Sequence, residues 1–550
     1  MIRVNRLTAL VAPLSYTGIV LAVVFFSISL SPSLLPRPYA LQGILSGIVL
    51  ALGYGLGVII KWLWDYLRLP LLRNKVLIIF KIIISILSAI LFFYSVYYSS
   101  QWQNDVRELM RLEASELHLP LLMMLIAIGL AALIFSLAKI MSLIFIKIKL
   151  RLKGIIPHRI AKVISFLLVA TLVFFLTNNM MIGKIVSALD NTYLIIDENI
   201  ASELSPPEWK DASGSSRSHI PWQSIGKTGQ EFIINGPDKK SIESFWGKPS
   251  LPPLRVYVGL RSKETAEERA ELALQELIRT KAFERSKLVI ATPTGTGWLD
   301  PHAVDTFEYL HQGDTAIVAM QYSYLPSWLT LLVDPSSAKD SAYQLYNKVH
   351  GYWSQLDKET RPDLYLFGLS LGAYGAETSI NLMTIIKNPI QGALFVGAPF
   401  TSTIAPILTK YRNEGSPQWL PIIQDGSMVR FSAQENSLIN KRWIWGPVRV
   451  VYIQYASDPI VFFSTDLYRK EPDWMTGLRG YDVSKDLQWF PLITFFQVLF
   501  DIPMADKMPR GSSHNYSTSS YIDGWVEVSD PNVWTAAKAE RLERIFDHVQ

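Results

Sequence analysis

Five long apolar runs dominate the first third of the chain. They lie near residues 8–30, 40–63, 82–101, 119–145 and 160–182. Each run has about the 20 residues that a helix needs to cross a hydrocarbon layer. Lysines and aromatic residues gather at the ends of the runs, as they do at membrane interfaces. Helices buried in a globular domain are the alternative, but five such runs in succession have no polar faces. Residues 1–185 are therefore predicted to form a membrane domain of about five helices.

The positions of the basic residues predict how this domain is oriented. Arg3 and Arg6 precede the first run, Arg68, Arg73 and Lys75 follow the second, and the loop after the fourth is rich in Lys and Arg. Basic loops remain in the cytoplasm, so the amino terminus is predicted to be cytoplasmic. Because five crossings is an odd number, the rest of the chain is expected on the outer face of a bacterial inner membrane. No run carries an acid at its middle, which disfavours a transporter.

The pattern of apolar residues changes after the last run. Residues 186–250 are mixed and polar and are predicted to be a linker with little regular structure. From there, short β-branched and aromatic runs alternate with amphipathic helical patterns, which is typical of a mostly parallel sheet with helices on both faces. The predicted strands lie in 254–260, 288–293, 315–324, 363–367, 392–399 and 448–455, and the clearest helices in 265–283 and 336–356. Residues 251–550 are therefore predicted to form one α/β domain.

Charge and cysteine content restrict the chemistry further. The chain has 550 residues and a formal net charge of +5, but residues 1–189 hold 18 Lys/Arg against 5 Asp/Glu, and the remainder holds 34 against 42. The basic character therefore belongs to the membrane-like part, and nothing favours a nucleic-acid partner. Cysteine is absent, which excludes disulfides, thiolate metal sites and a cysteine nucleophile.

The segment GLSLG at residues 368–372 carries the strongest chemical signal. It follows the apolar run DLYLF and opens a small-residue segment that can continue as a helix. A nucleophile elbow consists of a strand, a serine between two glycines, and a helix. Its turn is so tight that the positions two residues before and two residues after the serine have no room for a side chain larger than that of glycine. Ser370 is therefore the candidate nucleophile. A simple glycine-rich turn is the competing interpretation.

The candidate base is a histidine that follows Ser370. In folds with a nucleophile elbow the order along the chain is serine, acid, histidine, and only His514 and His548 lie beyond Ser370. His548 lies at the end of a charged segment that is predicted to be a terminal helix. His514 lies in a polar loop between small residues, where a mobile base is expected, so His514 is preferred.

The candidate acid should follow the strand that precedes the histidine loop. Asp458 comes directly after the predicted strand 448–455, where its carboxylate could orient the imidazole. An Asp-Pro turn is an equally ordinary reason for an aspartate there, and the two roles are compatible. Asp466 and Asp473 are alternatives that lie farther from the strand.

An oxyanion hole needs two N–H donors near the serine. The backbone N–H of Leu371, directly after the nucleophile, is the first candidate. The second is expected in the Gly/Thr-rich loop after the strand at 288–293, from Gly295, Thr296 or Gly297. A phosphate-binding loop is the competing interpretation, but the motif G-x-x-x-x-G-K-[ST] is absent. A general turn remains possible.

Several segments together resemble a bacterial family of membrane-anchored α/β-hydrolases. They are SPSLLPRP, TPTGTGWLDP, QYSYLPSWL and GLSLGAYGAE, followed by the late Asp and His. The resemblance covers nearly the whole chain, and GLSLG is its most specific part. It implies a five-span amino-terminal domain followed by a serine-hydrolase domain with the α/β-hydrolase fold. It does not indicate a substrate.

These features lead to a hypothesis of serine hydrolysis at a membrane. Ser370 would attack an acyl ester or thioester, His514 would move the proton, and Asp458 would hold the imidazole, with no cofactor and no metal. A set of aromatic residues suggests a lipid substrate, although such residues more often belong to the core; they are Trp298, Tyr322, Tyr324 and Trp328. The alternatives are an acyltransferase with the same acyl-enzyme and a catalytically silent scaffold. The oligomeric state is not predicted.

Overall fold

The computed structural model describes residues 14–70, 74–114, 120–177, 192, 204–380, 386–439 and 443–547. The chain divides into two compact units. The helical unit contains Met1–Ile182, Ser464–Thr476 and Val483–Met504, and the α/β unit contains Gly183–Phe463, Gly477–Asp482 and Ala505–Gln550. The segments Ser464–Thr476 and Val483–Met504 lie within the predicted domain 251–550 but pack with the amino-terminal helices, so a single domain over 251–550 stays a prediction.

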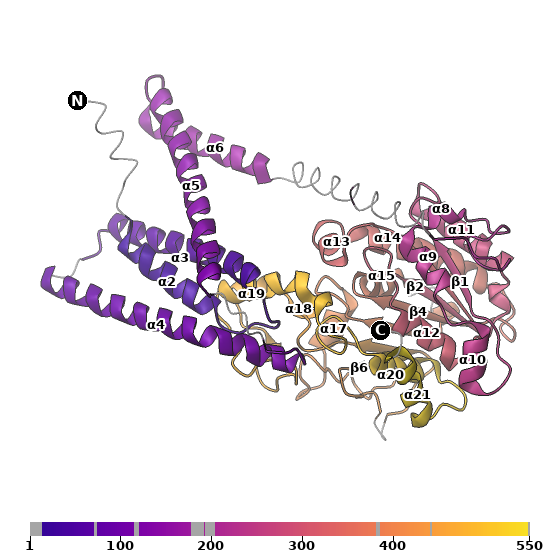
Figure 1. Ribbon diagram of the computed structural model, residues 1–550. Helices are drawn as coiled ribbons and strands as arrows, with labels where there is room; N and C mark the ends of the chain where they lie inside the picture. The colour runs from indigo at the N-terminus through magenta and orange to yellow at the C-terminus, as the bar shows by residue number, and fades with distance from the viewer. Residues whose placement is uncertain are drawn as a thin grey trace. The chain divides into compact units, whose positions relative to one another are not determined.

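A helix of the helical unit lies over each of the five apolar runs (Figure 1). The helices are α2 (Tyr16–Ser29), α3 (Tyr39–Tyr66), α4 (Asn74–Leu109), α5 (Pro120–Leu152) and α6 (His158–Thr177). Among the described residues, only α3, α4 and α5 are long and apolar enough to cross a membrane, whereas the sequence predicts five spans. Residues 8–13 and 178–182 of the first and last runs lie outside the described residues, as do Arg3, Arg6 and Arg73. The orientation therefore stays a prediction.

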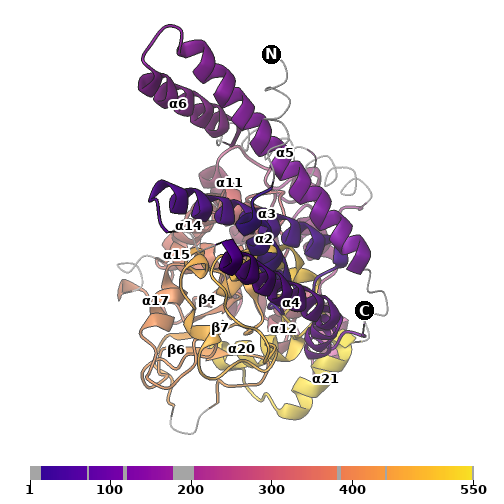
Figure 2. The ribbon, with the colours of Figure 1, turned by 90° about the vertical axis from the view of Figure 1, so that its left-hand side faces the viewer.

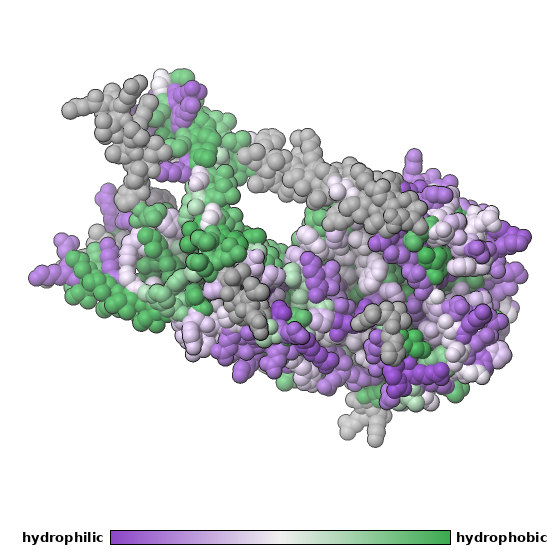
Figure 3. All heavy atoms as spheres, viewed as in Figure 1, coloured by the Kyte–Doolittle hydropathy of each residue, from purple (hydrophilic) through white to green (hydrophobic). Residues whose placement is uncertain are grey.

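Apolar residues cover much of the surface of the long helices. In Figure 3 the side chains are coloured as hydrophobic along most of α5 and over the amino-terminal part of α4. α5 packs against α6, as Figure 2 shows, and α2 packs closely against α3. A Cβ on Gly57 of α3 would lie 2.4 Å from the Thr17 carbonyl oxygen of α2, so glycine is needed where these two helices meet.

The α/β unit is built on one sheet of seven parallel strands. The spatial order is β1-β3-β2-β4-β5-β7-β6, and every pair of neighbours is parallel. The strands are β1 (Leu254–Val258), β2 (Lys287–Thr292), β3 (Thr315–Met320), β4 (Asp363–Leu369), β5 (Gly392–Val396), β6 (Val429–Ser432) and β7 (Arg449–Ile453). The six predicted strands are all present, and β6 is the one that the sequence analysis missed.

Helices cover both faces of this sheet, as predicted. One group contains α11 (Ala266–Arg279), α14 (Ser336–Trp353) and α15 (Leu371–Ser379), which pack on one another, and the other contains α12 (Pro301–Leu310) and α20 (Thr518–Ser529). Thr265 begins α11 with a complete capping box, since its side chain accepts from the Glu268 N–H and the Glu268 carboxylate accepts from the Thr265 N–H. This pairing satisfies two N–H groups that a helix start leaves without partners.

The predicted linker contains more regular structure than expected. Three short helices lie within it: α8 (Trp222–Ile225), α9 (Lys227–Ile234) and α10 (Lys239–Trp246). Trp222, Phe232 and Phe245 are buried, so these helices belong to the core of the α/β unit. The expectation of little regular structure is wrong for residues 222–246, because scattered polar residues obscured the apolar positions that face inward.

Candidate active site

Ser370 occupies a strained turn between β4 and α15. Its backbone angles are φ 59° and ψ −128°, a region that residues other than glycine rarely adopt and that costs on the order of 1–3 kcal/mol. Such strain is maintained only where the surrounding structure imposes it. The strand, the strained serine and the helix together have the geometry of a nucleophile elbow.

The two glycines around Ser370 allow the turn to close. A Cβ on Gly368 would lie 2.4 Å from the Gly372 carbonyl oxygen. A Cβ on Gly372 would lie 2.2 Å from the carbonyl oxygen of Thr292 and 2.6 Å from that of Pro293. Real Cβ atoms essentially never approach backbone so closely. The first turn of α15 therefore rests directly against the end of β2, where the candidate oxyanion loop begins.

Asp458 lies at the carboxyl end of β7 and is fully buried. It caps α18 (Pro459–Phe462), because its Oδ1 accepts a hydrogen bond from the Ile460 N–H at 2.9 Å. The Asp-Pro turn and an orienting role are thus both compatible with the geometry. The alternative acid Asp466 binds Arg469 in an exposed ion pair instead.

The imidazole of His514 is bound to this carboxylate. His514 Nδ1 lies 2.6 Å from Asp458 Oδ2, and the Tyr516 hydroxyl donates to the same oxygen at 2.6 Å. Burial, together with the negative charge of Asp458, raises the pKa of Tyr516 well above its usual range, so this phenol remains a donor. Because a carboxylate only accepts, Nδ1 is the donor of this bond, and in the neutral imidazole Nε2 is an acceptor. The other candidate, His548, lies outside the described residues.

Ser370 and His514 both adjoin the end of β5. The Ser370 N–H donates to the Val396 carbonyl oxygen at 2.8 Å, and a Cβ on Gly397 would lie 2.5 Å from His514 Cε1. His514 Nε2 is buried and has no hydrogen-bond partner among the described residues. No hydrogen bond of Ser370 Oγ is present within the same residues. The nucleophile and the base therefore share a neighbourhood without a direct bond, as is common when no substrate is bound.

The structure separates the four candidate oxyanion donors. Leu371 is the first residue of α15, so its N–H has no acceptor within the helix. In the loop after β2, the Gly295 N–H donates to Ser327 Oγ at 2.8 Å and the Gly297 N–H to the Thr294 carbonyl oxygen at 2.9 Å. Of the three candidates in this loop, Thr296 is the one whose N–H makes no hydrogen bond to the described part of the chain. The donors still available are therefore those of Leu371 and Thr296.

A second aspartate braces the acid and base loops and was missed in the sequence. Asp482 is buried, and burial raises its pKa. Its Oδ2 accepts from Ser457 Oγ at 2.5 Å, and Ser457 Oγ in turn accepts from the Ser513 N–H at 3.1 Å. Ser457 and Ser513 directly precede the candidate acid and base, so this carboxylate connects the two loops. Nothing in the local sequence around Asp482 signals the role.

An ion pair joins the histidine loop to the loop after β2. Arg510 Nη1 lies 3.1 Å from Asp300 Oδ2 and donates to the Tyr516 carbonyl oxygen at 2.8 Å. Asp300 is buried and also accepts from the Tyr521 hydroxyl. The sequence signal was available, because Asp300 lies in the segment TPTGTGWLDP. The ion pair between Asp300 and Arg510 could not be predicted from the sequence, because the order of the strands in the sheet was not known.

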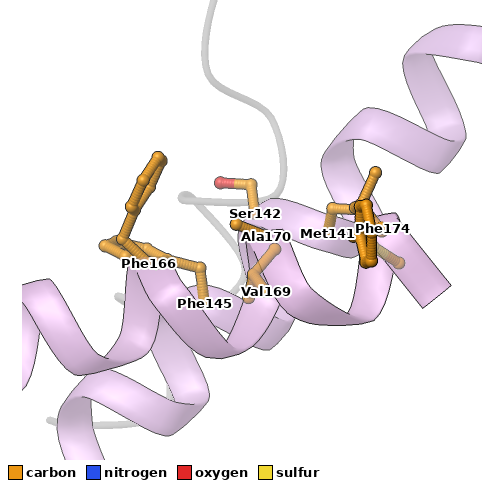
Figure 4. A pocket seen from close by; sticks show the side chains of 8 residues that line it. Met141, Ser142, Phe145, Phe166, Val169, Ala170 and Phe174 are labelled. Carbon is orange, nitrogen blue, oxygen red and sulfur yellow. The ribbon is translucent and has the colours of Figure 1, made fainter.

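Two hollows of the described surface differ in their chemistry. A small one beside the loop after β2 is lined by Trp298 and Leu299 together with the charged residues Glu231, Arg255 and Asp305. The other hollow is apolar, lies between α5 and α6 and is lined by Met141, Ser142, Phe145, Phe166, Val169, Ala170, Val173 and Phe174. Figure 4 shows its side chains, among which no group titrates. Within the described residues, no group of three or more His, Cys, Asp or Glu side chains could hold a metal ion.

Comparison with known proteins adds two matches. A family model described as an alpha/beta-hydrolase family matches residues 254–542, and a model described as the amino-terminal part of such a family matches residues 30–237. No curated protein and no solved structure matches the chain. The first model covers more than half of the chain. It includes all seven strands together with Ser370, Asp458 and His514.

Proposed function

The chain belongs to the α/β-hydrolase family, and on that premise we propose that it is a membrane-anchored serine hydrolase. Its substrates are acyl esters or thioesters at the outer face of a bacterial cytoplasmic membrane. The observation that carries the proposal is the arrangement around the end of β5. A strained serine adjoins a buried imidazole whose Nδ1 is bound to Asp458 at 2.6 Å and whose Nε2 has no hydrogen-bond partner among the described residues.

The proposed reaction begins with proton transfer. Ser370 Oγ attacks the acyl carbonyl carbon while its proton passes to His514 Nε2, and Asp458 stabilises the imidazolium that forms. The negative charge on the carbonyl oxygen is met by the N–H groups of Leu371 and Thr296. Each such donor contributes roughly 3–4 kcal/mol to a developing oxyanion. The protonated His514 then gives its proton to the leaving alcohol or thiol.

The second half of the reaction releases the acyl group. His514 takes a proton from water, the hydroxide attacks the acyl-Ser370 carbonyl, and the proton returns to Ser370 Oγ as the bond breaks. An acyltransferase would follow the same steps with an alcohol or amine in place of water. The partition of product between water and an added acceptor distinguishes the two reactions.

The membrane part of the proposal rests on the helical unit. α3, α4 and α5 have the length and apolar character of membrane spans, and an enzyme held at a lipid surface meets acyl chains there. Among the aromatic residues suggested for the substrate, Tyr322 and Tyr324 are buried, and the Tyr322 hydroxyl donates to the Pro293 carbonyl oxygen. Trp298 is 36% exposed and is the better candidate to contact an acyl chain.

Hydrolysis of p-nitrophenyl esters tests the proposal. The full chain in detergent, assayed with acyl chains of two to sixteen carbons, should hydrolyse at least one ester, and Ser370→Ala should reduce kcat by at least about a thousandfold. Ser286→Ala is the matched control, since Ser286 is exposed and precedes β2 at the opposite edge of the sheet. Equal activity in Ser370→Ala and wild type would exclude Ser370 as the nucleophile. Inactive wild type would favour the silent scaffold.

A further inference from the structure

The chain between the candidate acid and the candidate base leaves the α/β unit twice. After Asp458, the segments Ser464–Thr476 and Val483–Met504 both belong to the helical unit, and the chain returns at Ala505, nine residues before His514. The second segment contains α19 (Ile493–Asp501). The covalent path to the base therefore starts from a fixed element of the helical unit.

The end of α19 is held by a buried carboxylate. Asp501 has no exposed surface, and its Oδ2 accepts from the N–H groups of Leu34 and Leu35 at 3.1 and 3.3 Å and from the Ser33 hydroxyl. Arg37 Nε lies 3.6 Å from Asp501 Oδ1, with both side chains fully buried. All four partners belong to SPSLLPRP, the segment between α2 and α3.

Further contacts fix α19 one turn before Asp501. Gln497 Nε2 donates to the carbonyl and hydroxyl oxygens of Ser31 at 3.1 and 3.2 Å. Apolar side chains complete the attachment in one cluster, formed by Phe25, Ile28, Leu45, Val49, Phe490, Ile493, Phe496 and Phe500. A reversal between two helices does not need a carboxylate from more than 460 residues away. Burying a charge is costly unless it is paired and hydrogen-bonded. The fully buried and paired Asp501 therefore indicates a specific attachment of α19 to the SPSLLPRP segment.

The attachment leads directly to the base. Asp501 is the last residue of α19, and a short 3₁₀ segment, Ile502–Lys507, follows it. Within that segment the Ala505 carbonyl oxygen accepts a hydrogen bond from the His514 N–H at 3.3 Å. Only three residues separate Asp501 from the residue that holds the backbone of the candidate base.

We propose that Asp501, clamped by the SPSLLPRP segment, is a positioning residue for His514. The helical unit then contributes to catalysis as well as to anchoring, because its SPSLLPRP segment holds Asp501, after which residues 502–514 lead to the candidate base. This inference rests on the proposed function for its catalytic consequence. Its structural content, the fixing of residues 502–514, can be measured without activity.

Hydrogen exchange of the full chain in detergent tests the structural content. In Asp501→Asn, amides of residues 502–514 should exchange at least about tenfold faster than in wild type, while those of β1 keep their rate. Ser33→Ala removes one donor and should give a smaller change in the same amides without loss of the fold. Asp65→Asn is the matched control, since Asp65 forms an exposed ion pair with Lys61 in α3 of the same unit. Unchanged exchange at 502–514 in Asp501→Asn would overturn the proposal.

Labelling of Ser370 by a fluorophosphonate tests the catalytic consequence. Asp501→Asn should lower the labelling rate by about tenfold per folded molecule. In a His514→Ala background the same substitution should change the remaining rate less than twofold, because the residue acts through His514. Equal losses in both backgrounds would show a general structural effect and contradict the positioning role. Failure of wild type to label would refute the proposed function, while the exchange result would still decide the attachment.

Discussion

Asp458 receives hydrogen bonds from three groups among the described residues, and each has a different consequence. The Ile460 N–H begins α18, the Tyr516 hydroxyl shares Oδ2 with the imidazole, and His514 Nδ1 is the bond that determines the tautomer. An amide at position 458 could keep the first bond. It could not accept from Nδ1 and from Tyr516 with the strength of a charged oxygen.

Two substitutions separate these contributions. Asp458→Asn should lower kcat by about 10³–10⁴-fold, because the imidazole loses its fixed tautomer. Tyr516→Phe removes one neutral donor and should lower kcat by roughly tenfold or less. Steady-state kinetics on the best p-nitrophenyl ester measure both effects. A loss in Tyr516→Phe equal to that in Asp458→Asn would mean that the tyrosine itself takes part in the reaction.

Replacing glycine by alanine should have opposite effects on stability at two positions of the α/β unit. Gly372→Ala should prevent the elbow from closing, since the new Cβ would lie 2.2 Å from the Thr292 carbonyl oxygen; we expect a loss of several kcal/mol or no folded protein. Gly351→Ala in α14 meets open space and should stabilise the unit by about 0.5–1 kcal/mol, as alanine favours helix. Thermal unfolding compares the two. A stable Gly372→Ala would show that the elbow has room that the structure does not indicate.

At the scale of the element, the strands were predictable because buried parallel strands are short, apolar and rich in β-branched residues. β6 was missed, since its four residues include Arg430 and Ser432 and so lack that pattern. The elbow was predictable because its sterics dictate the sequence. The assignment of α19 to the helical unit was not, because an apolar helix in the sequence does not say which surface it will cover.

His311, which directly follows α12, should make the stability of the α/β unit depend on pH. Burial, with the positive charge of Lys287 nearby, lowers the pKa of His311 to about 3, compared with about 6.5 in an unfolded chain. Between these values the unfolded chain binds a proton that the folded chain does not. The free energy of unfolding should therefore fall as the pH decreases below about 6.5, by up to about 2 kcal/mol at pH 5.

Chemical unfolding at pH 5 and pH 7.5 measures this dependence. His311→Gln should weaken it, because the titrating group is gone. His219→Gln, which changes an exposed histidine, should leave it unchanged. The same pH dependence in His311→Gln and in wild type would show that other groups cause it.

At the scale of the whole molecule, the distribution of charge predicts where the α/β unit lies. The absence of cysteine allows single cysteines to report on topology. In intact spheroplasts, a membrane-impermeant maleimide should label Lys358→Cys in the α/β unit and should not label Lys153→Cys after α5, although both positions are exposed. After lysis both should be labelled. The reverse pattern in intact spheroplasts would place the α/β unit in the cytoplasm.

The most direct test of the account is to locate a covalent adduct on the protein. The purified full chain would be incubated with a fluorophosphonate, digested and analysed by mass spectrometry. We predict one adduct per molecule, on Ser370, with a rate that falls by at least a thousandfold in His514→Ala. An adduct on another serine, or an equal rate on Ser370 without His514, would contradict the assignment of Ser370, His514 and Asp458 as one catalytic unit.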